Sequence, residues 1–203
     1  MRILDCEQGS PEWLQARAGL VTCSELQCLL VNGKSDSGLG AEAISYMYRI
    51  IGERMTGQPT ESFSNVYTER GHALEPYARE LYMLQTDEVA TTCGFIINHG
   101  IGFSPDSLVG DVGLNEIKTK SPHLQAKVLY ENVTPAEHMA QMQGGLWVSE
   151  REWCDFVSYC SGMPLFVNRV YRDEVMIKKI SERVDAFYTE LERRLDVIVS
   201  NAA

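Results

Sequence analysis

The fold is decided by the stretch SPDSLVGDVGLNEIKT, residues 104–119. Turn residues in its middle precede a segment that reads as a strand, 114–119. Alternate side chains of a strand share one face, so Glu116 and Lys118 project together while Ile117 points to the other side. The turn can fold Asp106 back beside them. Two carboxylates and a lysine on one sheet face suit Mg²⁺ or Mn²⁺, with the lysine orienting or deprotonating a water for attack on a phosphodiester.

The spacing alone leaves a second interpretation open, in which this is an exposed strand face with an ordinary cross-strand ion pair. Short matches to an Asp…Glu-x-Lys pattern are common by accident. The spacing of these residues alone therefore does not distinguish a metal site from a surface ion pair.

Helix signals flank the strand segments on both sides. Pro11 follows an N-cap serine, and Pro135 follows Thr134 in a capping box, so each predicts a helix start. The expected helices cover residues 11–18, 22–30, 41–56, 65–85, 135–148 and 176–198. The expected strands cover residues 94–99, 101–104, 114–119, 153–160 and 165–171. Helices around a central strand cluster predict an α/β fold with a mixed β-sheet flanked by helices.

Length and composition predict one domain, 1–203, without a membrane span. We divide it into a helical N-terminal part (1–60), a core (61–171) and a C-terminal amphipathic helix (172–203). No apolar run approaches the roughly 20 residues that span a bilayer. The N-terminus lacks the apolar stretch of a signal peptide, and the six cysteines are scattered. Both features predict a cytoplasmic protein.

The negative net charge of the chain is not typical of a protein that binds nucleic acids without specificity. There are 18 Lys and Arg against 28 Asp and Glu, a net charge of −10, whereas such proteins usually carry a basic balance. Metal-bound acids would reverse the local sign seen by a phosphate. We therefore expect the acidic excess to lie on outer surfaces, away from such a metal site.

The whole pattern resembles a known family. Ser104-Pro105-Asp106 followed by Glu116-Ile117-Lys118 resembles the PD-(D/E)XK nuclease motif, and its context resembles the phage lambda exonuclease (YqaJ-type viral recombinase) family. The matching segments run in the same order across residues 7–160 and include 8–17, 19–25, 71–75 and 139–143, with Trp147 following. The resemblance implies a PD-(D/E)XK nuclease-like core.

The resemblance also implies a role for each matched residue. The implied metal ligands are Glu75, Asp106, Glu116 and the main-chain carbonyl of Ile117. Lys118 would activate the nucleophile, and Gln143 would position Lys118 or the water, although Gln141 is an alternative for that role. Without the family, Glu75 is a solvated helix acid and Gln143 a polar residue inside a packed helix.

A second implied site would hold the terminal 5′-phosphate of DNA. Arg17, Thr22 and Ser24 would form it, because arginine offers a bidentate fork and free N–H groups at a helix start attract anions. The alternative is a helix-surface arginine with ordinary N-capping at Thr22 and Ser24.

Apart from the resemblance, Lys118, Lys120, His123 and Lys127 form a small basic patch just after the core. It would either guide the DNA backbone past the metal ions or simply balance nearby acids. Lys118, Lys120 and Lys127, together with Arg17, are expected to line the DNA path.

The activity implied by the resemblance is that of an alkaline exonuclease. It would be Mg²⁺-dependent, with Mn²⁺ as a substitute and two ions per active site. It would degrade double-stranded DNA ends 5′→3′, release 5′-mononucleotides and leave a 3′ single strand for recombination by single-strand annealing. A ring-shaped homotrimer, a single-strand annealing protein as partner, and a phage or prophage origin in a bacterial host are also implied.

Two alternatives stay open at this point. One is a different PD-(D/E)XK nuclease, either an endonuclease or a Cas4-like exonuclease, which usually carries a four-cysteine iron–sulfur site. The other is a catalytically silent scaffold that binds DNA ends. The four histidines lack metal-type spacing, so we assign none of them a role.

Overall fold

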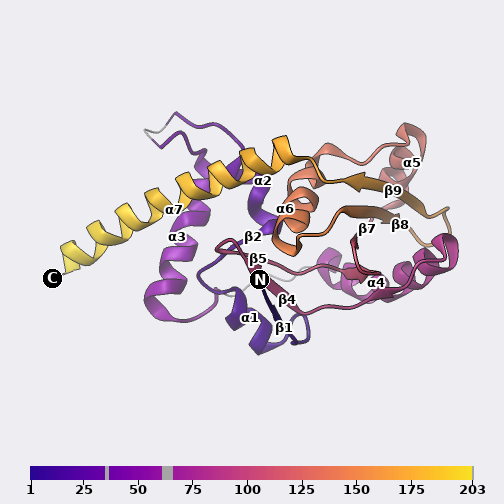
Figure 1. The fold of residues 1–203 in the computed structure, drawn as a ribbon, viewed down its shortest axis with the longest axis horizontal. Coiled ribbons are helices and arrows are strands. Elements are labelled where there is room, and N and C mark those ends of the chain that lie inside the picture. Colours follow the sequence, from indigo (N-terminus) through magenta and orange to yellow (C-terminus); the bar gives the residue numbers. More distant parts are fainter. Residues whose placement is uncertain (35–36, 61–65, 203) are drawn as a thin grey trace.

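The computed structural model describes residues 1–34, 37–60 and 66–202 and contains two β-sheets flanked by helices (Figure 1). The smaller sheet has the strand order β1-β4-β5-β2. Its strands are β1 (Arg2–Leu4), β4 (Phe95–Asn98), β5 (Ile101–Phe103) and β2 (Val21–Thr22). Only β2 and β5 run parallel within it. This sheet confirms the two strands expected after residue 93, whereas the two short strands β1 and β2 have no clear sequence signal.

The larger sheet carries the decisive stretch and has the order β3-β6-β7-β8-β9. Its strands are β3 (Ala90–Thr91), β6 (Ser107–Val109), β7 (Gly113–Thr119), β8 (Trp153–Tyr159) and β9 (Phe166–Tyr171). The central pair β7 and β8 is parallel and the other pairs are antiparallel. The predicted mixed sheet is therefore confirmed, with its parallel pair at the centre.

Helices cover both faces of the larger sheet. The helices are α1 (Pro11–Arg17), α2 (Leu26–Leu29), α3 (Ala41–Thr56), α4 (Val66–Thr86), α5 (Pro122–Glu131), α6 (Met139–Ser149) and α7 (Glu174–Ala202), with single 3₁₀ turns η1 (Cys23–Glu25) and η2 (Ala136–His138). On one face Ile117 packs in a cluster with Ala78 and Tyr82 of α4. On the other face Leu114 and Phe156 join the main core, to which α6 contributes. The chain reaches the parallel strand β8 from β7 through α5 and α6, as a crossover connection requires.

Helix α6 lies at the centre of the molecule because two glycines let its neighbours approach. A Cβ at Gly144 would stand 2.2 Å from a methyl carbon of Leu26, and one at Gly145 would stand 2.6 Å from the Phe103 ring. A larger side chain at either position would push α6 away from η1, α2 and β5. The close packing fixes which face of α6 turns toward the sheet, and so places the glutamines of this helix.

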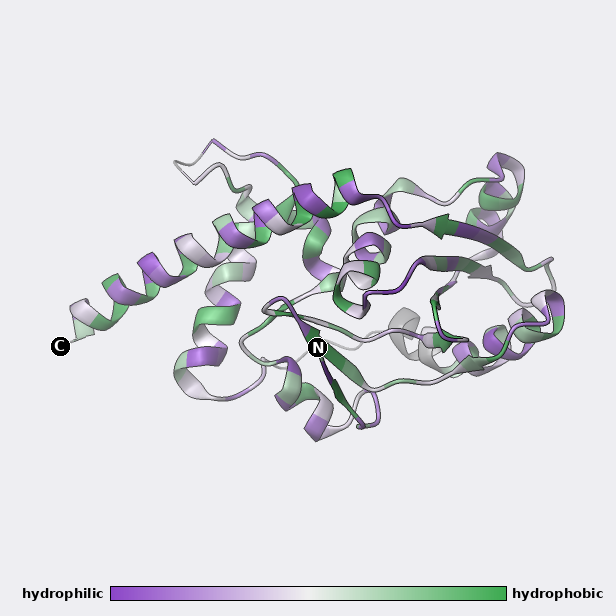
Figure 2. Ribbon diagram, in the orientation of Figure 1, coloured by the Kyte–Doolittle hydropathy of each residue, from purple (hydrophilic) through white to green (hydrophobic). Residues whose placement is uncertain are grey.

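The C-terminal helix α7 packs one apolar stripe against this body and runs past α3 toward the C-terminus (Figure 1). Its buried residues are Ile177, Ile180, Val184, Phe187 and Leu191. Hydrophobic and hydrophilic residues alternate along α7 (Figure 2). The predicted amphipathic helix is confirmed. Within the described residues, no helix is long and apolar enough to cross a membrane.

Several local expectations differ from the structure. The helix start expected at Pro135 is the 3₁₀ turn η2, whose N-cap is Pro135 and which has no side-chain capping hydrogen bond. The Thr134 hydroxyl instead accepts a hydrogen bond from the Asn168 side chain at 2.8 Å.

Helix α5, which starts at Pro122 after Ser121, was not expected, although an N-cap serine followed by proline is the same signal used for α1. Thr22 was expected to cap a helix, but its side chain makes no capping hydrogen bond and lies within hydrogen-bonding distance of Ser24, Oγ1 to Oγ 3.2 Å. The start of the expected 65–85 helix at residue 65 lies outside the described residues, and α4 is described from Val66.

Candidate active site

Glu116 and Lys118 share one face of β7, as the strand alternation predicts. Their side chains meet in an ion pair, with Lys118 Nζ 2.5 Å from Glu116 Oε1. The Glu116 side chain is 2% exposed and that of Lys118 is 31% exposed. A carboxylate so buried is costly unless it has a partner, so this pair is a charged feature built into the sheet rather than a solvated surface pair.

Asp106 lies beside this pair because β6 and β7 form an antiparallel hairpin. The register pairs Ser107 with Asn115, which returns the residue before β6 to the strand that bears Glu116. The Asp106 carboxylate accepts a hydrogen bond from the main-chain N–H of Ile117 at 2.5 Å. The fold-back expected from the turn residues is therefore present, and Asp106 approaches the face of Glu116 and Lys118.

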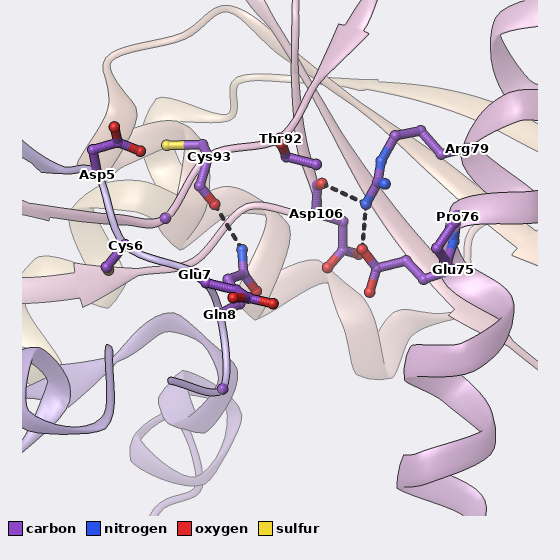
Figure 3. Close-up of a pocket in the computed structure, with 12 residues that line it drawn as sticks. Asp5, Cys6, Glu7, Gln8, Glu75, Pro76, Arg79, Thr92, Cys93 and Asp106 are labelled. Carbon is purple, nitrogen blue, oxygen red and sulfur yellow. Dashed lines mark hydrogen bonds and ion pairs between the residues drawn. The ribbon is translucent and has the colours of Figure 1, made fainter. Parts of the chain in front are cut away.

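Glu75 reaches the same region from α4, but its carboxylate is already engaged. Arg79, one turn further along α4, forms an ion pair with Glu75 (Figure 3). The Arg79 guanidinium also donates to the Asp106 carbonyl at 3.1 Å and to the Ser107 hydroxyl at 2.7 Å. Arg79 thus ties α4 to the start of β6. Sequence reasoning missed it, although a Glu and an Arg four residues apart on a helix are a recognised pair.

An open cleft of about 560 Å³ leads to Glu75 and Asp106 (Figure 3). Its lining also includes Asp5 and Glu7 from the segment after β1, and Arg79 supplies a positive charge. The expectation that basic residues line the DNA path does not hold for this cleft, because four acids face one arginine. A phosphate can approach such a lining only if a cation neutralises the carboxylates.

The acids of this cluster hold their protons more tightly than usual. Burial raises the pKa of Glu116 to about 7 and that of Asp106 to about 6, although Lys118 opposes both shifts. Burial likewise raises the pKa of Glu75, against the opposing effect of Arg79. Neighbouring carboxyls with raised pKa values are typical of functional sites, because packing alone gains nothing from them.

The pKa of Lys118 is raised as well, but by a different cause. Burial lowers its pKa, but the nearby carboxylates of Glu116 and Asp106 outweigh burial, and the net pKa is raised. In this arrangement Lys118 is an ammonium ion that donates hydrogen bonds. As an ammonium ion it can orient a water or a phosphate oxygen.

The oxygen atoms of these carboxylates are of the type that binds a hard divalent cation, but they are not all positioned to bind one ion together. Glu116 is buried, and its Oε1 atom has no hydrogen-bond partner of good geometry. The contact of this oxygen is the ion pair with Lys118. Asp106 and Glu116 offer carboxylate oxygens, which Mg²⁺ prefers. Across residues 1–34, 37–60 and 66–202, no three His, Cys, Asp or Glu side chains are grouped closely enough to hold a metal ion. One reason is that the Glu75 carboxylate is paired with Arg79 rather than available as a third ligand.

The two glutamines of α6 have different positions, and Gln143 does not join the cluster. Its amide is buried, donates to the Tyr171 carbonyl at 2.8 Å and accepts from the Asp173 N–H at 2.9 Å. Gln143 therefore fastens α6 to the connection between β9 and α7. The Gln141 side chain, by contrast, lies near Glu116 and favours its carboxylate form, which lowers the pKa of Glu116. Residues two apart on a helix point to different sides, so the structure selects Gln141 over Gln143 as the glutamine near the acids.

Arg17 lies in a separate pocket that adjoins the acidic cluster through Ser104. Its guanidinium stacks 4.1 Å from the centre of the Trp13 ring and donates to the Ser104 hydroxyl at 3.4 Å. The indole N–H of Trp13 donates to the same hydroxyl at 2.8 Å. Ser104, which the sequence motif contained but for which we predicted no role, thus contacts two residues that line the Arg17 pocket. Asp106 follows two residues later.

Thr22 takes part in this pocket more directly than Ser24 does. A cavity of about 210 Å³ is lined by Arg17, Thr22, Tyr46 and Arg49 among others, and Thr22 is buried there with its N–H donating to the Tyr46 hydroxyl at 3.0 Å. Ser24 is exposed and reaches the cavity lining through its contact with Thr22. Burial lowers the pKa of Arg17.

Among the basic residues expected along the DNA path, Lys120 directly follows β7 and Lys127 lies on α5. The Lys120 main-chain N–H donates to the Tyr159 carbonyl at 2.8 Å, which continues the pairing with β8. The Lys127 side chain is exposed and lies 3.7 Å from the Glu131 carboxylate. Of these two lysines, Lys120 is the one next to the cluster on β7.

The structure therefore has a PD-(D/E)XK-type nuclease core, with its motif on β7 and at the start of β6. The chain belongs to the YqaJ-like viral recombinase domain family, whose model matches residues 12–152. This confirms the family resemblance seen in the sequence. Membership supports a nuclease that acts on DNA.

Solved structures of similar proteins agree with this assignment. The alkaline exonuclease LHK-Exo from Laribacter hongkongensis is 36% identical, with a TM-score of 0.83, and the match covers 95% of this chain and 98% of that chain. LHK-Exo in complex with dAMP matches at a TM-score of 0.85 with the same identity and coverage. A phage-related exonuclease from Haemophilus somnus is 20% identical, with a TM-score of 0.67 over 91% of this chain and 96% of that chain, and shares the fold. No curated protein sequence matches the chain significantly.

The cysteines give no support to a Cas4-like iron–sulfur site. All six lie within the described part of the chain and all are free thiols. As no three metal-ligating side chains of that part gather at one place, a four-cysteine cluster is not built into this fold.

Proposed function

We propose that this chain is a Mg²⁺-dependent exonuclease that degrades double-stranded DNA ends 5′→3′. It would release 5′-mononucleotides and leave a 3′ single strand for recombination by single-strand annealing. The observation that carries the proposal is the short link between two sites, because Ser104 contacts Arg17 and Asp106 lies at the acidic cluster. Two residues of extended chain span at most about 7 Å. A terminal phosphate held at Arg17 would therefore place the next phosphodiester close to the carboxylates.

A relative supports the nature of the product. LHK-Exo was crystallised in complex with dAMP, a deoxynucleoside monophosphate, and it covers almost the whole chain. Release of such units from an end agrees with a pocket that holds one terminal phosphate beside the cleavage site.

Asp106 and Glu116 would hold Mg²⁺, or Mn²⁺ in its place, together with the main-chain carbonyl of Ile117. The ion would supply charge neutralisation at the scissile phosphate and a lowered pKa for a bound water. Two ions per site would also require Glu75, whose carboxylate must first exchange its partner Arg79. The Glu75 side chain is 25% exposed at the cleft, so this exchange does not require unfolding of α4.

The chain's own groups would orient the reaction. Lys118, kept as an ammonium by its acidic neighbours, would donate hydrogen bonds to the attacking water or to a phosphate oxygen. Gln141, which lies near Glu116 and favours its ionised form, would help to orient the Glu116 carboxylate. Arg17 and Ser104 would bind the terminal 5′-phosphate through charge-assisted hydrogen bonds, with Thr22 and Ser24 beside them.

Exchanging the two glutamines of α6 for alanine should separate catalysis from stability. We expect Gln141→Ala to slow digestion about tenfold, because the Glu116 carboxylate loses a neighbour that helps to orient it. The free energy of unfolding should change little. We expect Gln143→Ala to lower the free energy of unfolding by roughly 1–3 kcal/mol, since a buried N–H and a carbonyl lose their partner. Steady-state digestion and urea titration measure the two effects. Slower digestion by folded Gln143→Ala than by Gln141→Ala would contradict the placement.

Replacing Arg17 should reveal the phosphate pocket through substrate choice. Arg17→Ala is expected to slow digestion of 5′-phosphorylated ends by about 10- to 100-fold, and that of 5′-hydroxyl ends far less, because only the former lose a charge-assisted contact. Arg17→Lys keeps the charge without the fork and should fall between them. The rates are compared on otherwise identical duplexes. Equal slowing on both ends would mean that Arg17 serves packing against Trp13 instead.

The alternatives can be separated by the form of the DNA. A closed circular plasmid offers no ends, so an exonuclease leaves it intact while an endonuclease nicks or linearises it. A silent end-binding scaffold would retain linear duplex without shortening it in Mg²⁺. Digestion of linear duplex with an untouched plasmid is the outcome that the proposed function requires.

We further propose that the chain works in the bacterial cytoplasm as a ring-shaped homotrimer together with a single-strand annealing protein. Family membership is the support for both partners. Sedimentation equilibrium tests the assembly: three chains per particle are expected, and a monomeric mass across working concentrations would rule the ring out.

A further inference from the structure

Lys120 extends the functional face of β7 by one more position. Because its main chain continues the pairing with β8, the alternation that joins Glu116 and Lys118 also brings Lys120 to their side. Lys118 is neutralised by its ion pair with Glu116. Lys120, by contrast, forms no ion pair with any acid of the described residues, so its charge remains available on this face.

The Lys120 ammonium is instead held by a histidine. Its Nζ lies 3.3 Å from Nε2 of His138, the last residue of η2, just before α6. The imidazole stacks on the Phe156 ring with centres 5.2 Å apart and planes 22° apart. Phe156 is fully buried on β8 and is paired in register with Glu116. The ring of His138 is thus fixed by the core beside the active strand.

The chemistry of the contact requires a neutral imidazole. An ammonium has only donors, so Nε2 must accept and the ring proton must be on Nδ1. Burial, followed by the charges of Lys118 and Lys120, lowers the pKa of His138 to about 4, which agrees with this. The Glu137 carboxylate is 3.8 Å from Nε2, too far for a hydrogen bond.

A neutral acceptor has a consequence that a carboxylate would not have. A carboxylate would fix the lysine and cancel its charge, whereas an imidazole fixes the ammonium and leaves the charge in place for a phosphate. We propose that His138 is a positioning residue that holds Lys120 against a backbone phosphate of the DNA strand at this face. The inference rests on the proposed function, because it assumes that DNA occupies the active face.

A double-mutant cycle on binding tests this inference. The variants are K120A, H138F, H138Q and K120A/H138F, and the probe is a 5′-phosphorylated duplex in Ca²⁺ buffer, with affinity measured by fluorescence anisotropy at several salt concentrations. H138F keeps the stacking on Phe156 and removes the acceptor, whereas H138Q retains an acceptor. K178A, which removes an exposed lysine of α7, controls for general loss of charge.

We expect K120A to weaken binding about tenfold and to reduce the salt slope by about one phosphate contact. H138F should weaken it about three- to fivefold in the wild-type background and have no further effect beside K120A. H138Q should stay within about twofold of wild type. The inference would be overturned if H138F lowered the affinity for DNA equally in the wild-type and K120A backgrounds. It would also be overturned if H138F and H138Q lowered that affinity equally.

A measurement on the unmodified ring keeps the test independent of folding in the His138 variants. The ¹⁵N chemical shifts of His138 should show a protonated Nδ1 and an unprotonated Nε2 in the wild-type protein. A protonated Nε2 would contradict the contact with Lys120. If wild type fails to bind the duplex but shows this tautomer, the proposed function fails and the lysine–histidine contact stands, so the two failures are distinguishable.

Discussion

Replacing Lys118 with alanine is expected to slow Mg²⁺-dependent DNA digestion by about 10²- to 10⁴-fold while the fold and metal binding persist. Lys118 is the ammonium closest to the buried carboxylates, 2.5 Å from Glu116. Its loss removes the donor that would orient the water or phosphate oxygen. The metal would still bind, because the ammonium competes with it for the same oxygens. Single-turnover digestion gives the rate, and the shift of the unfolding temperature with Mg²⁺ gives metal binding.

The matched control is Lys178→Ala, in which an exposed lysine of α7 is lost from outside the site. It should digest DNA within about twofold of wild type, as surface substitutions usually have small effects. Undiminished digestion by folded Lys118→Ala would remove the active-site assignment. Loss of both digestion and the Mg²⁺-dependent shift would mean that Lys118 maintains the site rather than acting in it.

Replacing Asp106 with asparagine is expected to abolish digestion and yet to stabilise the metal-free protein at alkaline pH. Burial raises the pKa of Asp106 from its ordinary 3.8 to about 6. The folded state therefore binds a proton more tightly than the unfolded state. The stability that follows from this is complete below about pH 4 and is lost as the pH rises through 6. Asparagine stays neutral and keeps an acceptor for the Ile117 N–H.

The expected gain for Asp106→Asn is roughly 1–3 kcal/mol in free energy of unfolding at pH 8 in EDTA, because each pKa unit corresponds to about 1.4 kcal/mol. The difference from wild type should vanish near pH 4. Saturating Mg²⁺ should reverse it, since wild type gains stability by binding the ion. Urea titrations at both pH values measure this. A less stable Asp106→Asn protein at pH 8 in EDTA would show that the carboxylate serves structure instead of a charge-bearing site.

The central part of the site could be predicted from the sequence because it depends on local geometry. Strand alternation places Glu116 and Lys118 together whatever the rest of the fold does, and a short turn returns Asp106 to the same strand. The packing stripe of α7 follows in the same way from helix periodicity. These features follow from the periodicity of side chains in strands and helices and from the turn residues, all of which can be read locally in the sequence.

Other parts depend on packing between distant segments and had no local signal. Gln141 and Gln143 both lie in a helix that is apolar nearly all round, so which one faces the acids is decided by the close approach at Gly144 and Gly145. The contacts of Trp13 and Arg17 with Ser104 join segments about ninety residues apart. Short strands such as β3 and β6 exist only because they pair within the larger sheet.

Arg79 and His138 are a different case, because sequence signals were present but ambiguous. The spacing of Glu75 and Arg79 indicates a helix ion pair, yet nothing in the sequence shows that the pair faces a cleft. His138 is one of four scattered histidines, and only the fold brings it to Lys120. In both cases the residue becomes informative through its partner.

The polarity of digestion is measured on linear duplex DNA labelled at either the 5′ or the 3′ end and incubated with Mg²⁺ and the wild-type chain. We predict that the 5′ label leaves first, as a mononucleotide, and that the 3′ label stays on a long single strand. Early release of the 3′ label, or release of the 5′ label on long fragments, would contradict a 5′→3′ exonuclease built on the Arg17 pocket and the Asp106, Glu116 and Lys118 cluster.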